Sequence, residues 1–276
     1  MQRIFYSDNT TIGDYTLEAR NADTIPAEMV AAEDYIYIAS WDPMNSFFIQ
    51  IETANTNASI MSIQYWGNSE WADAVDIIDG TKSSGKTLAQ TGVVKFIPDK
   101  DKMFQRVTDT TSDSAPSELS SIEIYDRFWL RIKVSADLSA GTEIKRIFYR
   151  FADDAKLNYL DPVLSNYLTS WEAGKSNWDE QLMTASEEVV LDLRRRGIIQ
   201  GSEQLINIDE LELMTAYRAL QIIYSGLGGE NELKKAEAAG KKYHDISGNM
   251  RFTIDVYGDA RINVDEREIM QGRLVR

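Results

Sequence analysis

Glu143-Ile-Lys-Arg-Ile-Phe-Tyr149 is the last stretch in the first half of this 276-residue chain in which apolar and polar residues alternate. Alternation with a period of two is typical of a strand that buries one face. After Arg150 the period changes, and apolar residues return at the spacing of a helix. The first helical set is Trp178, Leu182, Ala185, Val189 and Leu193. The change of period therefore separates a β-rich half from a helical half.

The half before this change predicts an antiparallel β-sandwich over residues 31–152. Gly92–Ile97, Ser121–Tyr125 and Phe128–Val134 are short runs, rich in β-branched and aromatic residues and bounded by turn residues. About seven such strands at this spacing are typical of a sandwich. Residues 1–30 are polar around Pro26, and we expect them to form an extended arm or an irregular lead-in.

The half after the change predicts an all-helical domain over residues 153–266. Asn177-Trp-Asp-Glu180 resembles a capping box, in which Asn177 accepts from a first-turn N–H while Glu180 reaches back. Arg194-Arg-Arg196 suits the dipole at the end of this helix, and Gly197 is expected to stop it. The predicted fold is thus α+β and multidomain, with a sandwich followed by an all-α helical bundle and a tail over residues 267–276.

Three further helices are expected in the second half. One opens near Asn207 or Asp209, another spans residues 230–246, and a shorter one spans Asp161–Trp171 with Pro162 in its first turn. One face of the first of these helices is expected to carry Leu213, Tyr217, Leu220 and Tyr224. On the helix over residues 230–246, the residues expected to face inward are Leu233, Ala236, Ala239 and Tyr243.

The chain is strongly acidic, with 29 Lys and Arg against 44 Asp and Glu and a formal net charge of −15. Such a surface repels phosphate and disfavours ordinary groove binding to nucleic acid. It is either a solubilising surface or the wall of a passage through which DNA slides. The chain has no cysteine, which excludes disulfides and fits a reducing compartment. No secretory signal and no membrane-spanning apolar run is expected, so no membrane partner is expected either.

The segment Asp255–Glu266 has the outline of a calcium-binding loop. Its candidate ligands are Asp255, Asp259, Asn263 and Glu266. Tyr257 replaces an oxygen ligand, and Ala260 replaces the glycine that the sharp turn needs. We therefore favour a degenerate loop held by Asp side-chain caps over a metal site, and we expect no cofactor.

We find no catalytic constellation and expect that the protein is not an enzyme. His244 is the only histidine and falls near a predicted helix end, where a solvated histidine is expected. No Gly-x-Ser-x-Gly elbow is present. The triple arginine Arg194–Arg196 is either a solvated helix end or a patch whose guanidinium groups bind carboxylates of a partner.

Six aromatic residues in the first half allow a second functional interpretation. An exposed aromatic row could stack on sugar rings, although aromatics in strands more often belong to a core. The alternative function is therefore a carbohydrate-binding sandwich joined to a dockerin-like docking domain. The six residues are Trp41, Tyr65, Trp66, Trp71, Tyr125 and Trp129.

The helical half, Leu160–Glu266, resembles the head–tail adaptor (connector or head-completion) proteins of tailed bacteriophages. The likeness lies in Trp178–Glu180, Glu187–Ile198 and Glu210–Leu220, and then in the closing Arg251–Asp259. In that family a helix with a similar basic end precedes two antiparallel helices and an Asp-rich turn. Trp71–Val94 and Trp129–Leu138 resemble, more weakly, sandwich domains that phages add to virion proteins.

This resemblance implies a structural virion protein of the phage neck, at the head–tail junction, made in the host cytoplasm. About twelve copies would form a ring through heterologous contacts, joined to the portal protein and to a tail or neck protein. DNA would pass through the lumen without sequence-specific binding, during packaging and genome ejection. In the family such C-terminal tails reach the portal, which makes Arg273 and Arg276 interface candidates beside Arg194–Arg196.

Overall fold

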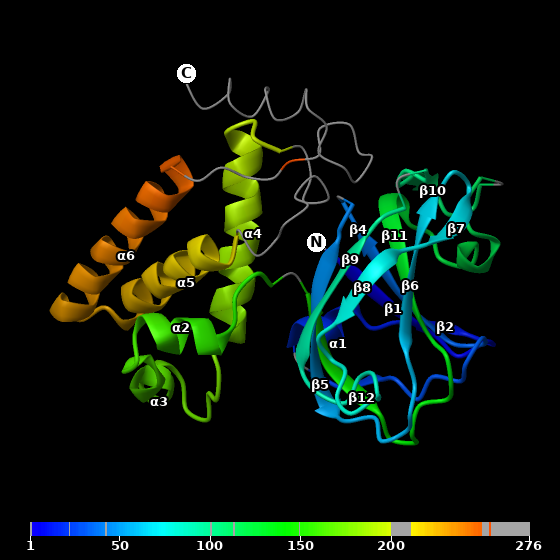
Figure 1. Ribbon diagram of the computed structural model, residues 1–276, viewed down its shortest axis with the longest axis horizontal. Coiled ribbons are helices and arrows are strands. Elements are labelled where there is room, and N and C mark those ends of the chain that lie inside the picture. Colours follow the sequence, from blue (N-terminus) through cyan, green and yellow to red (C-terminus); the bar gives the residue numbers. More distant parts are fainter. Residues whose placement is uncertain are drawn as a thin grey trace. The chain divides into compact units, whose positions relative to one another are not determined.

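The computed structural model describes residues 2–21, 23–41, 43–99, 101–112, 114–148, 150–199, 211–249 and 254. The chain is of the α+β class, with antiparallel strands first and helices second (Figure 1). It divides into two compact units, one with the strands up to Phe148 and one with the helices from Asp154 onward.

The larger sheet of the first unit has seven antiparallel strands, in the order β2-β1-β4-β11-β6-β7 with β10 paired to β11. The register places Ile38 of β4 opposite both Ile4 of β1 and Leu130 of β11, and all three side chains are buried. Its strands are β1 (Arg3–Ser7), β2 (Ile12–Asp14), β4 (Tyr35–Ser40), β6 (Met61–Gly67), β7 (Glu70–Asp73), β10 (Val107–Asp109) and β11 (Tyr125–Val134).

The smaller sheet has five antiparallel strands, in the order β3-β12-β5-β9-β8. They are β3 (Ile25–Pro26), β5 (Ser46–Thr53), β8 (Val75–Asp79), β9 (Gly92–Ile97) and β12 (Glu143–Phe148). β9 and β12 follow the alternating runs that the sequence predicts. The short helix α1 (Thr16–Asn21) and the 3-10 turn η1 (Ser117–Leu119) complete the unit.

The prediction of an N-terminal arm over residues 1–30 is wrong. The segment contributes β1, β2, α1 and β3, and β1 lies between β2 and β4 in the larger sheet. Ile4 and Phe5 are 1% and 2% exposed, so they belong to the core. Polar residues surround these short strands, so the sequence shows no clear strand periodicity there. β1 is held in the sheet by its pairing with β4.

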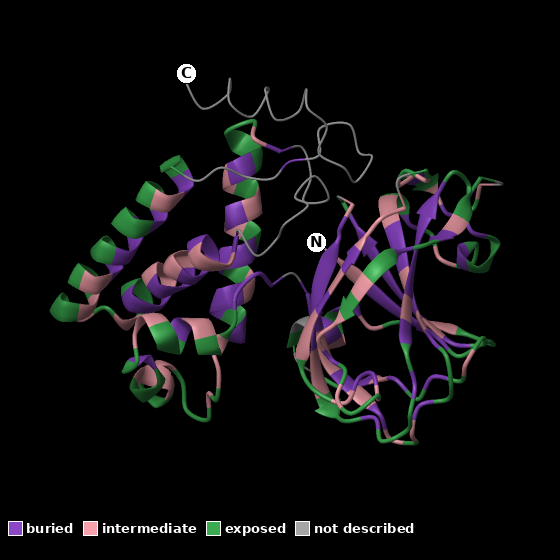
Figure 2. Cartoon of the chain, in the orientation of Figure 1, coloured by how far each residue is buried: buried purple, intermediate pink, exposed green. Residues whose placement is uncertain are grey.

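One face of the larger sheet is covered by a segment of its own unit. Ser121–Tyr125 was expected to be a strand, but β11 begins only at Tyr125. Ala115, Leu119 and Ile124 instead pack in the buried cluster that contains Trp129, and Figure 2 shows the buried positions of the unit in purple. The buried cluster consists of Phe5, Tyr37, Ala39, Trp66, Val107, Ala115, Leu119, Ile124 and Trp129.

The second unit is helical, and α5 packs against α2, α3, α4 and α6. The expected apolar face of α4 is confirmed, because Trp178, Leu182, Ala185, Val189 and Leu193 are all buried. Its elements are α2 (Asp154–Leu160), the 3-10 turn η2 (Leu164–Tyr167), α3 (Leu168–Trp171), α4 (Asp179–Arg195), α5 (Glu212–Leu227) and α6 (Glu230–Asn249). Within the described part of the chain, every helix is too short or too polar to span a bilayer.

Two helical predictions need correction. The range Asp161–Trp171, where one helix is expected, instead holds η2 and α3, after α2 has ended at Leu160. Asp161 is extended because a residue before proline avoids the helical region. On α6, Leu233 is 46% exposed, whereas Ala236, Ala239 and Tyr243 are buried as expected. On α5, Leu220 and Tyr224 are buried, but Leu213 and Tyr217 are only half-buried. The expected start near Asn207 or Asp209 lies outside the described residues.

Candidate interaction surfaces

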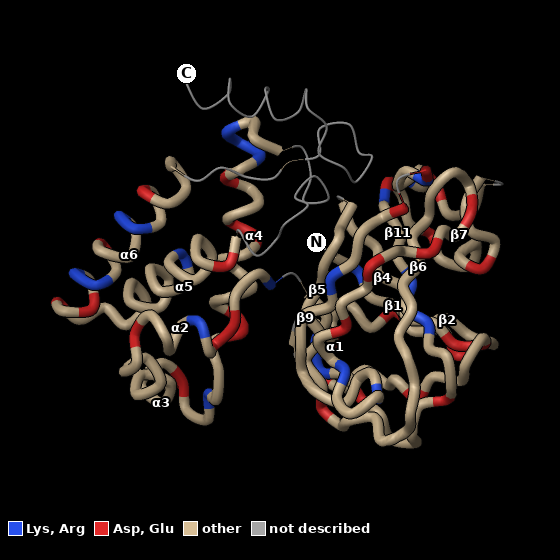
Figure 3. Tube along the Cα trace, in the orientation of Figure 1, with Lys and Arg blue, Asp and Glu red and all other residues tan. Residues whose placement is uncertain are grey.

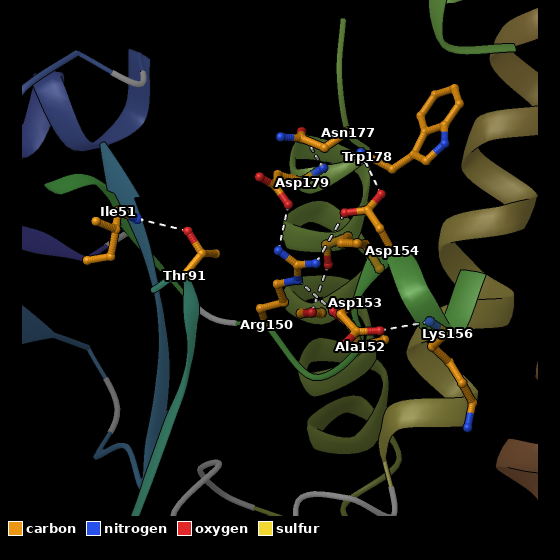
Figure 4. Close-up of polar contacts among 12 residues, drawn as sticks. Ile51, Thr91, Arg150, Ala152, Asp153, Asp154, Lys156, Asn177, Trp178 and Asp179 are labelled. Carbon is orange, nitrogen blue, oxygen red and sulfur yellow. Dashed lines mark hydrogen bonds and ion pairs between the residues drawn. The ribbon is translucent and has the colours of Figure 1, made fainter. Parts of the chain in front are cut away.

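Arg150 lies at the centre of a buried polar cluster in the helical unit (Figure 4). Its Nη1 is 2.5 Å from Asp179 Oδ1 and its Nη2 is 3.3 Å from Asp154 Oδ2. Its Nε donates to the carbonyl oxygen of Ala152 at 2.7 Å. The side chains of Arg150 and Asp179 are only 4% and 5% exposed. A charge pair this deep is matched inside the protein, so the cluster is a structural anchor.

The same cluster determines where α2 and α4 begin. Asp153 caps α2 by accepting from the Lys156 N–H at 2.7 Å, and Asp154 accepts from the Trp178 N–H at 2.9 Å. Asn177 accepts from the first-turn N–H of Asp179 at 3.2 Å, as predicted, but the N-cap of α4 is Trp178 and not Asn177, so the predicted capping box needs correction. The Glu180 carboxylate contacts Lys175 Nζ at 3.3 Å. These contacts make residues 150–152 part of the helical unit, so the predicted boundary after residue 152 lies too late.

The C-terminal end of α4 closes as the sequence predicts. Gly197 has φ +67°, and its N–H donates to the Arg194 carbonyl at 2.9 Å. The Ile198 N–H donates to the Leu193 carbonyl at 3.0 Å, which completes a Schellman motif. Arg196 donates to the Ser247 carbonyl at 2.7 Å and lies 3.6 Å from Asp192, so it links α4 to α6. Of the triple arginine, Arg196 thus has a role within the subunit.

Arg194 and Arg195 remain exposed at the end of α4, where basic residues gather (Figure 3). Leu191, one turn earlier, is 45% exposed although the opposite side of the helix is in the core. Glu187 is exposed one turn before Leu191. Residues spaced by three and four lie on the same side of a helix. We call Glu187, Leu191, Arg194 and Arg195 the α4 stripe.

A second polar cluster fixes α6 on α5 and on the end of α2. The Asp161 carboxylate accepts from the Tyr224 hydroxyl and lies 3.1 Å from Lys235 Nζ. Lys235 Nζ also lies 4.8 Å from the centre of the Tyr224 ring. Burial would raise the pKa of Asp161, but its contacts with Tyr224 and Lys235 outweigh burial and hold the pKa below its ordinary value.

The exposed aromatic row that sugar binding would need is absent among the six candidates, all of which the structure describes. Tyr65, Trp66 and Trp129 are buried, so they belong to the core. Trp71 is half-buried, donates to Glu118 at 2.7 Å and carries the Arg131 guanidinium 4.5 Å from its ring centre. Trp41 and Tyr125 alone are exposed, by 47% and 55%. The geometry therefore does not favour the carbohydrate-binding alternative.

Several candidates lie outside the described residues, namely Asp255, Asp259, Asn263, Glu266, Arg273 and Arg276. The described residues contain no group of three or more His, Asp or Glu side chains that could hold a metal ion. His244 is exposed on α6, with its ring centre 5.3 Å from that of Tyr243. This location confirms the expectation of a solvated histidine near a helix end.

Comparisons of the chain with protein-family models, with curated proteins and with solved structures find no match.

Proposed function

We propose that this chain is a structural adaptor of the tailed-bacteriophage neck, located in the virion at the head–tail junction. Copies of the chain form a ring between the portal protein and a tail or neck protein. The β-rich unit is a β-sandwich carried by the ring, and the helical unit is the adaptor bundle. The resemblance of the helical half to that family, and the order of the two units, support this proposal.

The α4 stripe is the observation that carries the proposal. Leu191 is nearly half exposed on a helix that is otherwise anchored in the core. Covering its exposed surface would contribute about 1 kcal/mol per copy. Glu187 and the two arginines at opposite ends of the stripe suit a heterologous contact, in which guanidinium groups bind carboxylates of the next copy. A ring repeats this contact around its circumference.

The net charge of −15 supports the passage of DNA through such a ring. A wall that repels phosphate lets a duplex slide without specific or lasting contacts. The protein would therefore assemble around DNA without reading its sequence and without catalysing a reaction.

Gold-labelled antibody against this chain tests the proposed location on tailed particles of the virus that carries it. We expect label only where head meets tail, and we expect heads without tails when the chain is not produced. Label on the head surface or tail tip, or complete tailed particles made without the chain, would contradict the proposal.

A further inference from the structure

Three arginines meet at one end of the larger sheet, where β4 ends and β11 begins. Arg3 is the register partner of Ala39, and Arg127 is the partner of Val107. Arg106 directly precedes Val107, and Trp41 directly follows β4. We call Arg3, Trp41, Arg106, Tyr125 and Arg127 the arginine–tryptophan patch. Its residues come from four separate parts of the first unit, so the fold itself brings them together.

Arg127 is held in place while part of its guanidinium stays unmatched. Its Cζ lies 3.1 Å from the centre of the Trp41 ring, and its Nη1 donates to the carbonyls of Tyr125 and Asp126 at 2.9 and 3.1 Å. Its Nε is buried and has no hydrogen-bond partner among the described residues. Arg106 is exposed above the Phe128 ring and forms no ion pair with any described residue. Arg3 is paired with Asp14.

This gathering of like charges costs free energy in the isolated chain. Burial lowers the pKa of Arg127, and repulsion from Arg3 and Arg106 lowers it further, against the attraction of Asp126. The chain carries 44 acidic residues, yet within the described part only Arg3 of these three arginines has a carboxylate at ion-pair distance. An anionic group from outside the chain would relieve the repulsion.

We propose that the arginine–tryptophan patch is a docking site for a short carboxylate-bearing segment of a partner protein. Tryptophan, tyrosine and arginine are the residues that most often dominate the energy of protein interfaces. Guanidinium groups bind carboxylates through paired hydrogen bonds. A nucleic acid fits less well, because a long polyanion leaving the patch would pass Asp14 and Asp126 and a chain of net charge −15.

Fluorescence anisotropy with labelled hexaglutamate and labelled hexathymidylate, on the full-length chain at low salt, tests the site. We expect hexaglutamate to bind and the double variant Arg106→Ala, Arg127→Ala to lose about tenfold or more in affinity. Arg127→Lys keeps the charge but loses the planar stack on Trp41, so a smaller loss is expected. The matched control is Lys241→Ala, Lys242→Ala, which removes the same charge from two exposed positions on α6 and should retain the affinity.

Three outcomes would overturn the proposal. The first is no binding of hexaglutamate, and the second is an equal loss of affinity in the α6 control, which would show that net charge alone acts. The third is tighter binding of hexathymidylate, which would assign the patch to nucleic acid. The single variant Arg106→Ala changes an exposed residue, so we expect it to remain folded, which circular dichroism checks. A loss of hexaglutamate affinity in this variant then reports lost binding and not lost folding. The result does not depend on the proposed neck location.

Discussion

Arg150 follows the last strand and binds carboxylates at the beginnings of two helices. Part of this cluster could be expected from the sequence, because Asp153 and Asp154 lie three and four residues beyond Arg150. Asp179 could not, since it lies 29 residues away and only the folded chain brings it near. Sequence patterns thus predict the local caps of these helices, but they do not predict the buried Arg150–Asp179 pair that joins the start of α2 to the start of α4.

Arg150→Met should destabilise the helical unit by about 3–5 kcal/mol, because it leaves the buried Asp179 carboxylate without its guanidinium. Urea unfolding followed by helical circular dichroism measures the change. Lys234→Met is the control, since it breaks a pair whose side chains are 68% and 86% exposed. That control should cost less than about 1 kcal/mol. Equal losses of unfolding free energy in Arg150→Met and Lys234→Met would refute the anchoring role of Arg150.

The contacts of the Asp161 carboxylate make the stability of α6 packing depend on pH, and this stability falls in acid. Because its folded pKa lies below the unfolded value, its contribution is fully present above about pH 5 and is lost as pH falls below about 4. Asp161→Asn should be less stable than the parent at pH 6, and the difference should shrink at pH 3. Urea midpoints at the two pH values measure this. A difference that does not change with pH would contradict the assignment.

At the scale of elements, α4 was predictable and β1 was not. The buried face of α4 and its stop at Gly197 follow from residues that lie within a few turns of one another. β1 is short, and it becomes ordered by pairing with β4 about thirty residues later, as in Ile4 opposite Ile38. Periodicity cannot show such non-local pairing. Pro162 did carry a local signal, but it marks the end of α2 and not the start of a helix.

Gly197→Ala should destabilise the helical unit by about 1 kcal/mol, because the glycine has φ +67° and alanine avoids that region. Gly248→Ala is the matched control, since a Cβ there meets no atom within 4 Å and the residue lies in α6. The control should be neutral or stabilising by up to about 1 kcal/mol. Thermal unfolding compares the two. A larger loss of stability in Gly248→Ala than in Gly197→Ala would contradict the assignment of a Schellman motif to the end of α4.

At the scale of the whole molecule, the surfaces that meet other chains were only partly predictable. The triple arginine was a candidate from its sequence alone, but the structure separates Arg196, bonded to Ser247, from the exposed Arg194 and Arg195. Leu191 was not a candidate, because only the packed helices show which leucines remain exposed. The arginine–tryptophan patch was also unpredictable, since β-sheet register assembles it.

Leu191→Glu should prevent ring formation without unfolding the subunit, because it places a charge in the proposed contact and leaves the core unchanged. Sedimentation velocity in the presence of portal protein measures assembly. Leu17→Glu, at a leucine that is 66% exposed in the first unit, is the control and should assemble normally. Normal assembly of Leu191→Glu would remove the α4 stripe from the contact.

Native mass spectrometry of the chain mixed with its cognate portal protein tests the adaptor proposal most directly. We predict a complex in which many copies of the chain, about twelve, bind one portal ring in a fixed ratio. Portal rings that stay bare, or that carry the chain in no fixed ratio, would contradict the proposal.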